Sequence, residues 1–323
     1  MNSFGDKWTF TSFGESHGAA IGGVLDGVPA GLVIDMNLIR RELERRAGKG
    51  VTGDGLQVTG VSPRALREPD EVEWLSGVIK NEKLKIKNED ASDHELVTLG
   101  TPIAFIIRNK DARPEDYEWL KTTYRVGHAD KVYEQKYGIR DWRGGGRASA
   151  RETAGRVVAG CVAKQQLAEK GITIHAELIQ VGSETDPAKF NDTIASYQRD
   201  GDSIGGIIEC RITGLPVGVG EPIFNKLQAE LAFAVMSINA CKGFEYGTGF
   251  GGVTQPGSAI NAISGGISGG ISDGTEVVFR CVFKPTPSTP KAGIKGRHDA
   301  CVATRAVPVV EAMTAIALID LLS

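Results

Sequence analysis

Apolar and polar residues recur along this chain with the two periods of regular secondary structure. Short apolar runs predict five strands, at residues 19–25, 101–107, 172–181, 206–212 and 277–283. Longer runs with helical spacing predict four helices, at residues 35–47, 150–169, 226–239 and 308–322. Because strands and helices are interspersed, the pattern predicts a mixed α and β fold. The sequence has no linker rich in Ser and Pro, and we expect a single domain over residues 1–323.

The first and the last predicted helices differ in their surroundings. Asp35 stands where a residue caps a helix and Gly48 where a glycine ends one. The polar face between them reads as a solvated basic face, made by Arg40, Arg41, Arg45 and Arg46. The last helix is expected to open with Pro308 and is apolar around nearly its whole circumference, which predicts burial on most sides. Asp320 within it is costly unless a partner satisfies the carboxylate.

Composition narrows the class of protein. The 323 residues are 41% hydrophobic and 24% charged, which is typical of a globular protein, and the net charge of -3 argues against a nucleic-acid binder. The 42 glycines indicate many tight turns or backbone that approaches a ligand closely. The five cysteines show no CxxC spacing, so we expect reduced thiols and no metal site. With no signal pattern and no stretch fit to span a bilayer, we expect a cytoplasmic enzyme without a membrane partner.

The most distinctive local motif is the glycine loop at residues 144–146, which leads into a predicted helix. Ser149 and Glu152 have the spacing of a capping box. Arg147 and Arg151 add positive charge. A glycine loop before a helix offers free N–H groups and the positive end of the helix dipole, which suits phosphate. Taken alone, the motif supports a phosphate site and a plain capped turn about equally, and it is neither a GxGxxG nor a GxxxxGK[ST] motif.

Other short turns carry ionisable side chains. Residues 13–18 (FGESHG) present His17, and residues 125–130 (RVGHAD) present His128. Residues 297–299 (RHD) form a third polar cluster, and residues 284–288 (KPTPS) supply a cation and hydroxyls just after a strand. Each turn by itself is as readily structural. Histidine exchanges protons near neutral pH, and together the turns predict a site for anionic small molecules.

These segments together resemble the chorismate synthase family, from one end of the chain to the other. The matching segments are FGESHG (13–18), GHAD (127–130), QKYGIR (135–140), GGGRASARET (144–153), MSINACKG (236–243), residues 265–272, KPTPS (284–288) and KGRHDACVATRAVPVVEAM (295–313). The resemblance implies an α+β fold, a β-α-β sandwich with central helices between antiparallel sheets. It implies a homotetrameric lyase of the shikimate pathway. That lyase converts 5-enolpyruvylshikimate 3-phosphate to chorismate and phosphate by a 1,4-anti elimination that requires reduced FMN.

The resemblance also implies roles for individual residues. His17 donates a proton to the leaving phosphate, and His128 lies beside the flavin. Ser16 and Asp320 relay the ring proton. The flavin-contacting positions are Arg147, Ala148, Ser149, Asn239, Ala240, Gly269, Lys284, Pro285, Thr286, Pro287, Ser288 and Arg297. The substrate-binding positions are Arg45, Arg46 and Lys49.

The source of reducing power stays open between two routes. The protein uses NADPH itself, or an external reductant acts and NADPH serves only indirectly. No reductase-like segment is visible in the sequence, which favours the external route.

The chain departs from the family pattern after Arg46, where residues 47–53 replace a further arginine, a proline and a basic segment. Lys49 is the cation that stands nearest, although a lysine lacks the bidentate fork of arginine. The loops near residues 254–264 and 287–295 are shorter than in most members. The positions where the family commonly has a serine or a proline, and this chain does not, are Ala148, Val126 and Ala300.

Two alternatives follow from these departures and from the basic helix. The first is a flavin-binding relative with lost or altered catalysis. The second is a nucleic-acid-binding module on the arginine face, which the acidic net charge and the lack of interleaved aromatic residues make the weaker of the two.

Overall fold

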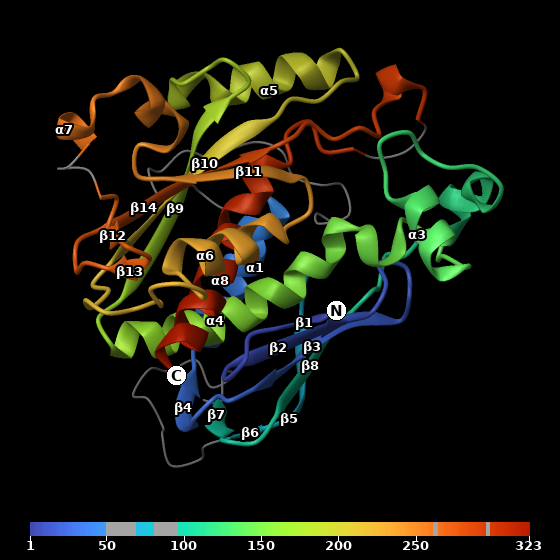
Figure 1. The fold of residues 1–323 in the computed structure, drawn as a ribbon. Coiled ribbons are helices and arrows are strands. Elements are labelled where there is room, and N and C mark those ends of the chain that lie inside the picture. Colours follow the sequence, from blue (N-terminus) through green and yellow to red (C-terminus); the bar gives the residue numbers. More distant parts are fainter. Residues whose placement is uncertain (50–68, 81–95, 261–263, 295–297) are drawn as a thin grey trace.

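Two antiparallel sheets lie on opposite sides of a layer of helices (Figure 1). The protein is seen in a computed structural model that describes residues 1–49, 69–80, 96–260, 264–294 and 298–323. The first sheet has the order β1-β2-β3-β8-β5, with strands β1 (Ser3–Phe4), β2 (Thr9–Phe13), β3 (Ala20–Asp26), β8 (Ile103–Arg108) and β5 (Val72–Ser76). The second has the order β11-β14-β10-β9, with strands β11 (Cys241–Tyr246), β14 (Val277–Phe283), β10 (Gly206–Thr213) and β9 (Thr173–Val181).

Each large sheet turns one apolar face toward the helices. In β8, Ile103, Phe105 and Ile107 are buried, whereas the residues between them are more exposed. In β14, Phe279 and Phe283 are buried in the same alternating way. A period of two is what a sheet with one covered face requires. The five predicted strands are confirmed, with ends that differ by at most two residues from those expected.

Four helices fill the space between the sheets: α1 (Met36–Ala47), α4 (Thr153–Glu169), α6 (Leu227–Met236) and α8 (Ala303–Leu322). Helix α4 packs against β2, β3 and β8 of the first sheet, and α8 packs against β9 and β10 of the second. The two helices meet closely where Gly160 faces Ala312, since a Cβ on the glycine would lie 2.3 Å from the alanine Cβ. The predicted α+β sandwich with central helices is therefore confirmed.

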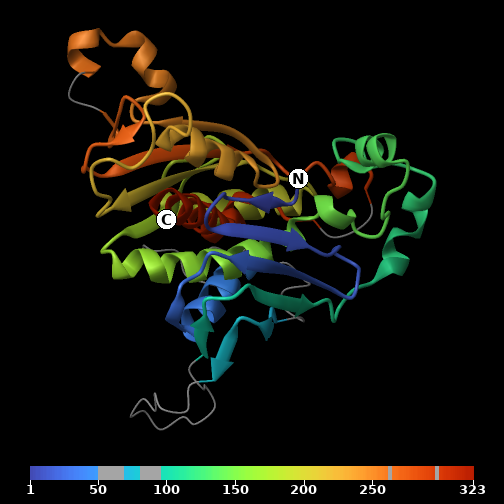
Figure 2. The same cartoon turned by 60° about the horizontal axis from the view of Figure 1, so that its bottom comes forward.

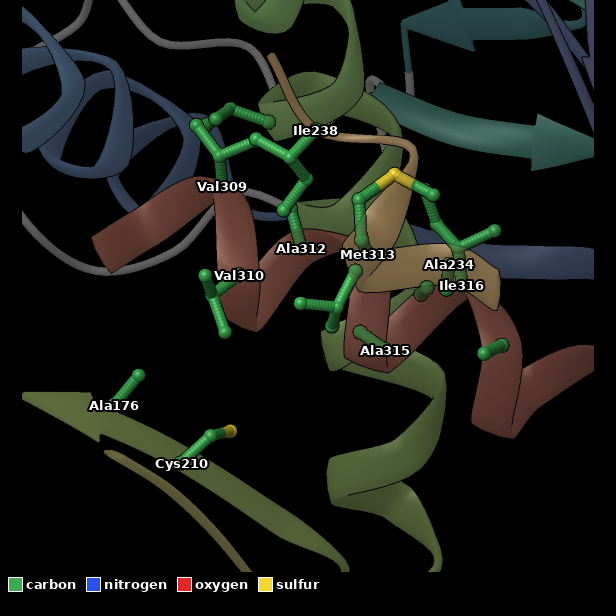
Figure 3. Close-up of a cluster of buried hydrophobic side chains, with 14 of the residues drawn as sticks. Ala176, Cys210, Ala234, Ile238, Val309, Val310, Ala312, Met313, Ala315 and Ile316 are labelled. Carbon is green, nitrogen blue, oxygen red and sulfur yellow. The ribbon is translucent and has the colours of Figure 1, made fainter. Parts of the chain in front are cut away.

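Helix α8 is the centre of the hydrophobic core. Met313 and Ile316 lie beside Ala234 of α6 (Figure 3), and Cys210 of the second sheet contacts Thr314 of α8, with its Sγ 3.9 Å from the threonine hydroxyl. The predicted burial of this helix on most sides is confirmed. The expectation that it begins at Pro308 is wrong, because the helix begins at Ala303 and Pro308 lies inside it. There the proline lacks the N–H that would bond one turn back, a cost that the surrounding apolar packing offsets.

The ends of α1 follow the sequence prediction. The Asp35 carboxylate accepts the N–H groups of Asn37 and Leu38, each at 2.9 Å, and Gly48 adopts the left-handed conformation with φ of 81°. The prediction of a solvated basic face is wrong for half of that face. Arg45 and Arg46 are largely buried, whereas Arg40 and Arg41 are exposed.

Smaller elements surround this framework (Figure 2). They are the sheet β4-β7-β6, with strands β4 (Ala30–Ile34), β7 (Leu96–Leu99) and β6 (Val78–Lys80), the hairpin of β12 (Ile267–Ser268) and β13 (Ile271–Ser272), and helices α3 (Asp130–Tyr137), α5 (Phe190–Arg199) and α7 (Gly257–Ile260). In the part of the chain that the structure describes, no helix is both long and apolar enough to cross a membrane. The five cysteines are buried free thiols, as predicted.

Candidate active site

Both predicted catalytic histidines pack against the glycine loop that precedes α4. Gly144 and Gly145 are left-handed, with φ of 60° and 91°, a conformation that favours glycine. A Cβ on Gly144 would lie 2.1 Å from both Cε1 and Nδ1 of His17, and a Cβ on Gly145 would lie 2.8 Å from Cε1 of His128. The loop is thus glycine-rich because imidazole rings lie directly against its backbone. Two histidines that are more than a hundred residues apart in sequence thus contact adjacent glycines of the same turn.

His17 is held by the turn that joins β2 to β3. Its ring meets Tyr117 edge-on, with centroids 4.9 Å apart. The hydroxyl of Ser16, which is buried, lies 3.1 Å from Nδ1 of His17. Ser16 and His17, which the resemblance gave separate catalytic roles, are therefore in direct contact.

His128 lies at the start of α3 with two charged partners. Its Nδ1 is 2.8 Å from Oδ1 of Asp130. Arg125 donates hydrogen bonds to the same carboxylate from Nε and Nη2, each at 2.9 Å. Burial opposes ionisation of Asp130, but the hydrogen bonds from Arg125 and His128 outweigh it and hold the pKa of the carboxyl well below its usual range.

The loop after β14 packs on the His128 turn. A Cβ on Gly127 would lie 3.0 Å from Cβ of Pro287, and Nζ of Lys284 lies 3.4 Å from the Gly127 oxygen. The N–H of Lys284 donates to the oxygen of Ala240 at 3.0 Å. Ala240 is itself left-handed, with φ of 68°, which is rare for a residue with a Cβ. Of the predicted flavin positions, Lys284 and Pro287 therefore meet the His128 turn, and Ala240 adjoins Lys284.

Asn239 links this region to the glycine loop. Its Nδ2 donates to the Ala148 oxygen at 3.1 Å. Its Oδ1 is buried without a hydrogen-bond partner among the described residues, and the same is true of Nε2 of His298. Buried polar atoms are nearly always satisfied, so the Asn239 oxygen, which can only accept, points to a bound group.

Arg147 and Ser149 serve the loop itself. The Arg147 guanidinium donates to the Gly14 oxygen and the Ser12 hydroxyl, each at 3.0 Å, and so ties the His17 turn to the glycine loop. The predicted capping box does not form. Ser149 accepts the N–H of Arg151, whereas Glu152 pairs with an arginine one turn further along α4.

A small cavity of about 30 Å³ lies where the N-terminal ends of α4 and α8 approach α1. Arg46, Asn239, Asp299 and Arg305 are among its lining residues. Arg46 donates to the Thr153 hydroxyl at 2.9 Å. Arg305 donates to Asp299 at 2.7 Å.

The residues around this cavity form a buried charged cluster. Arg46 and Arg151 both pair with Asp70, and Arg305 lies close enough to oppose the charge of Arg46. Burial lowers the pKa of Arg46 to about 10, against the attraction of Asp70. Positive charge is in excess here, which suits an anion.

A second cavity of about 320 Å³ opens beside the glycine loop. Its lining includes Tyr133, Arg140, Gly145 and Arg147. A small molecule therefore has room next to the turn that carries the two histidines.

Arg45 belongs to a different cluster from the one that sequence reasoning gave it. It pairs with Glu42 at 2.7 Å and with Glu311 of α8 at 3.0 Å, and Lys164 of α4 pairs with Glu311 as well. These contacts tie three central helices together. The structure thus directs Arg45 into the helix layer.

Asp320 is also placed elsewhere. Its carboxylate accepts the backbone N–H groups of Asp6, Lys7 and Trp8, at 3.0, 2.7 and 2.9 Å. It lies fourteen residues beyond Ala306 of the small cavity, or about 20 Å along α8. The carboxylate is satisfied by the N-terminal turn, and the predicted relay with Ser16 has no support in this geometry. The carboxylate that the structure does bring to the Arg46 cavity is Asp299.

Three other predicted positions do not join the site in the described chain. Gly269 forms the turn between β12 and β13, on the side of the molecule opposite α3 (Figures 1 and 2). Lys49 is exposed at the end of the described segment. Arg297 lies outside the described residues.

Sequence reasoning missed Asp70, Arg305 and the role of Asp299. Asp299 had a signal, because it belongs to the polar RHD cluster. Asp70 had none, since nothing local distinguishes it from other acidic loop residues.

The comparisons with known proteins agree on one family. The chorismate synthase family model matches residues 8–322. A chorismate synthase of Christiangramia forsetii is 42% identical, covering 99% of this chain and 96% of the relative. One from Porphyromonas gingivalis is 44% identical, covering 99% and 95%. A crystal structure of a chorismate synthase matches with a TM-score of 0.73 and 29% identity, covering 99% of this chain and 92% of that one.

The alignments also bear on loop length. The first runs over 367 positions, 44 more than the 323 residues of this chain. The relative therefore contains residues that this chain lacks.

Proposed function

This chain belongs to the chorismate synthase family of enzymes, and on that premise we propose that it converts 5-enolpyruvylshikimate 3-phosphate to chorismate and phosphate with reduced FMN. The observation that carries the proposal is the meeting of His17 and His128 on the Gly144–Gly145 turn. Two proton-exchanging side chains that pack against one glycine loop suit a reaction that removes a phosphate and a ring hydrogen from one substrate.

The residues beside this turn fit a flavin. The buried, unpartnered Oδ1 of Asn239 suits a ring N–H donor, and Lys284 with the hydroxyls of Thr286 and Ser288 suits anionic groups. Reduced FMN, when bound, supplies an electron-rich ring beside the substrate. The left-handed Ala240 backbone between these residues is a strained feature of the kind that gathers at binding sites.

His17 is placed to protonate the departing phosphate. As an imidazolium, His17 would donate from Nδ1 to the Ser16 hydroxyl and give the proton on Nε2 to the phosphate. The buried arginines near Asp70 stabilise negative charge as it develops on the leaving group. Asp299, on the cavity that it shares with Arg46, takes the role of acid–base carboxylate that the sequence gave to Asp320.

The test is an anaerobic assay with 5-enolpyruvylshikimate 3-phosphate and chemically reduced FMN, run with and without NADPH. Chorismate and phosphate in equal amounts are expected with reduced FMN alone, if an external reductant serves the enzyme. Formation of chorismate from oxidised FMN and NADPH would show that the protein reduces its own flavin. No chorismate under any condition contradicts the proposal.

One observation favours the alternative of a flavin-binding relative with altered catalysis. Arg45 and Arg46, the arginines assigned to the substrate, are both committed to internal hydrogen bonds. Flavin binding without elimination in the anaerobic assay would support that alternative.

We extend the proposal to the whole chain and its setting. The buried apolar residues from Trp8 to Ile319 join in one cluster, which supports a single domain. Exposed aromatic residues on and near α6, Phe224, Phe233 and Phe250, support the expected homotetramer. Light scattering at micromolar protein would show a mass four times that of the 34.4 kDa chain. We also propose a cytoplasmic location.

A further inference from the structure

We infer that Asp130 is a positioning residue that fixes which ring nitrogen of His128 carries the proton, so that Nε2 alone exchanges protons with a bound group. The inference rests on the proposed function for its catalytic consequence. The geometry that supports it stands apart from that function. Asp130, His128 and Arg125 form one compact group at the start of α3.

The contacts of Nδ1 decide where the proton lies. Nδ1 of His128 is 2.8 Å from Oδ1 of Asp130 and 3.1 Å from Nη2 of Arg125. If Nδ1 carried a lone pair, that lone pair would lie 2.8 Å from an ionised carboxylate oxygen that has no hydrogen to offer. With the proton on Nδ1, the same contact becomes a charge-assisted hydrogen bond. Nη2 of Arg125 can only donate and would need a bare Nδ1, but it already donates to Oδ1 of Asp130 at 2.9 Å, and the carboxylate is the nearer neighbour of Nδ1. On this balance the neutral ring of His128 carries its proton on Nδ1.

Arg125 keeps the carboxylate in the form that this contact requires. Its backbone N–H and Nε donate to Oδ2 of Asp130, at 3.1 and 2.9 Å, and its Nη2 donates to Oδ1 at 2.9 Å. The side chains of Arg125 and Asp130 are 9% and 2% exposed, so solvent does little to screen the pair. The carboxylate stays charged and its orientation is fixed.

The opposite nitrogen faces the glycine loop. A Cβ on Gly145 would lie 3.1 Å from Nε2 of His128, so Nε2 points at the backbone of the turn that also carries His17. The cavity of about 320 Å³ is lined by both Asp130 and Gly145. Nε2 is therefore the ring nitrogen on the side of the glycine loop, while Nδ1 lies against Asp130.

An asparagine at position 130 should reverse the arrangement. With its oxygen at the Oδ2 position it keeps the two bonds from the Arg125 backbone and Nε, and its NH₂ then faces Nδ1 of His128. The other orientation would set the NH₂ against both of those donors. Asp130→Asn should therefore donate to Nδ1 and move the ring proton to Nε2. A misplaced proton of this kind disables a catalytic histidine without a change of fold.

The experiment measures the tautomer directly by nitrogen NMR of protein labelled with ¹⁵N-histidine. The His128 signals are assigned by their loss in His128→Gln. We expect a protonated Nδ1 and a bare Nε2 in the neutral ring of the wild-type protein, and the reverse in D130N. Glu134→Gln is the matched control, because Glu134 accepts from Arg140 at 2.7 Å on the same helix with no histidine in that ion pair. In E134Q the tautomer should not change.

Turnover in the anaerobic assay provides the second readout. D130N should lose on the order of 100-fold in turnover, the contribution of one general acid or base, with E134Q close to wild type. A protonated Nε2 in the wild-type ring overturns the inference, even if D130N does not fold. D130N with a reversed tautomer and wild-type turnover also overturns it. A correct tautomer in a wild-type protein that makes no chorismate would refute the proposed function and leave the positioning role of Asp130 supported.

Discussion

The closest contact in the candidate site gives the sharpest prediction. Gly144→Ala adds a Cβ that would lie 2.1 Å from Cε1 and Nδ1 of His17 and 3.0 Å from Oγ of Ser16. Carbon atoms in contact stand about 3.5 Å apart, so the imidazole must move by about 1.4 Å or the loop must shift by a similar amount. Either movement separates His17 from the position that the glycine turn gives it.

The expected effect on turnover follows from this displacement. A reacting group misplaced by about 1 Å can cost on the order of 100-fold in rate, and we expect a loss of that size in G144A. The left-handed backbone, with φ of 60°, adds about 1–2 kcal/mol of strain for alanine. Stability alone therefore cannot separate a local clash from a general backbone effect.

Gly138→Ala is the matched control. Gly138 ends α3 with φ of 74°, and a Cβ there would have nothing within 4 Å. Both variants carry the left-handed strain and should lose stability in urea unfolding, G144A the more because of its clash, whereas G144A alone should lose turnover in the anaerobic assay. Equal turnover in the two variants would refute the claim that position 144 requires glycine because a side chain there would displace the His17 ring.

Two further outcomes are expected from carboxylates in α8. Burial opposes ionisation of Glu311, but Lys164 and Arg45 outweigh it and hold its pKa at about 2, below the model-peptide value of about 4.5. Its contribution to stability is therefore complete above about pH 4.5 and is lost as the pH falls toward 2. Glu311→Gln should cost about 3 kcal/mol at pH 7 and flatten that part of the pH profile of unfolding, and an unchanged profile would contradict the ion-pair account. Asp320→Asn should cost about 1–3 kcal/mol, because the amide lacks the negative charge and its NH₂ would face the Asp6 N–H that Oδ2 accepts, yet leave turnover near wild type. If the Asp320→Asn variant has normal stability but greatly reduced turnover, Asp320 acts in catalysis.

The two acidic residues of α8 show what an acid in an apolar helix does and does not predict. An acid in an apolar helix signals that some partner satisfies it, and both Glu311 and Asp320 have partners. The pattern cannot tell what kind of partner. Glu311 meets two cations on neighbouring helices, and Asp320 meets the backbone of the first residues of the chain. Neither partner is near in sequence, so only the packed chain distinguishes a structural acid from a catalytic one.

The arginines of α1 also differ in ways that the sequence pattern does not distinguish. Arg40, Arg41, Arg45 and Arg46 look alike in the sequence, and a solvated face was the natural interpretation. The helix nevertheless buries Arg46 against Thr153 and Asp70, because the N-terminal ends of α4 and α8 close over that side of it. Which side of a polar helix becomes buried depends on the elements that pack on it.

What the sequence by itself determined was local. The periods of apolar residues placed the strands and helices, Asp35 and Gly48 marked the ends of α1, and the glycine turns marked where chemistry gathers, since each of these depends on neighbours within a few residues. Only the tertiary structure decided which turns meet. It set His17 and His128 against one glycine loop, brought Asp299 to the Arg46 cavity and gave Asp320 to the N-terminal turn, because contacts between distant segments are chosen by how the whole core packs.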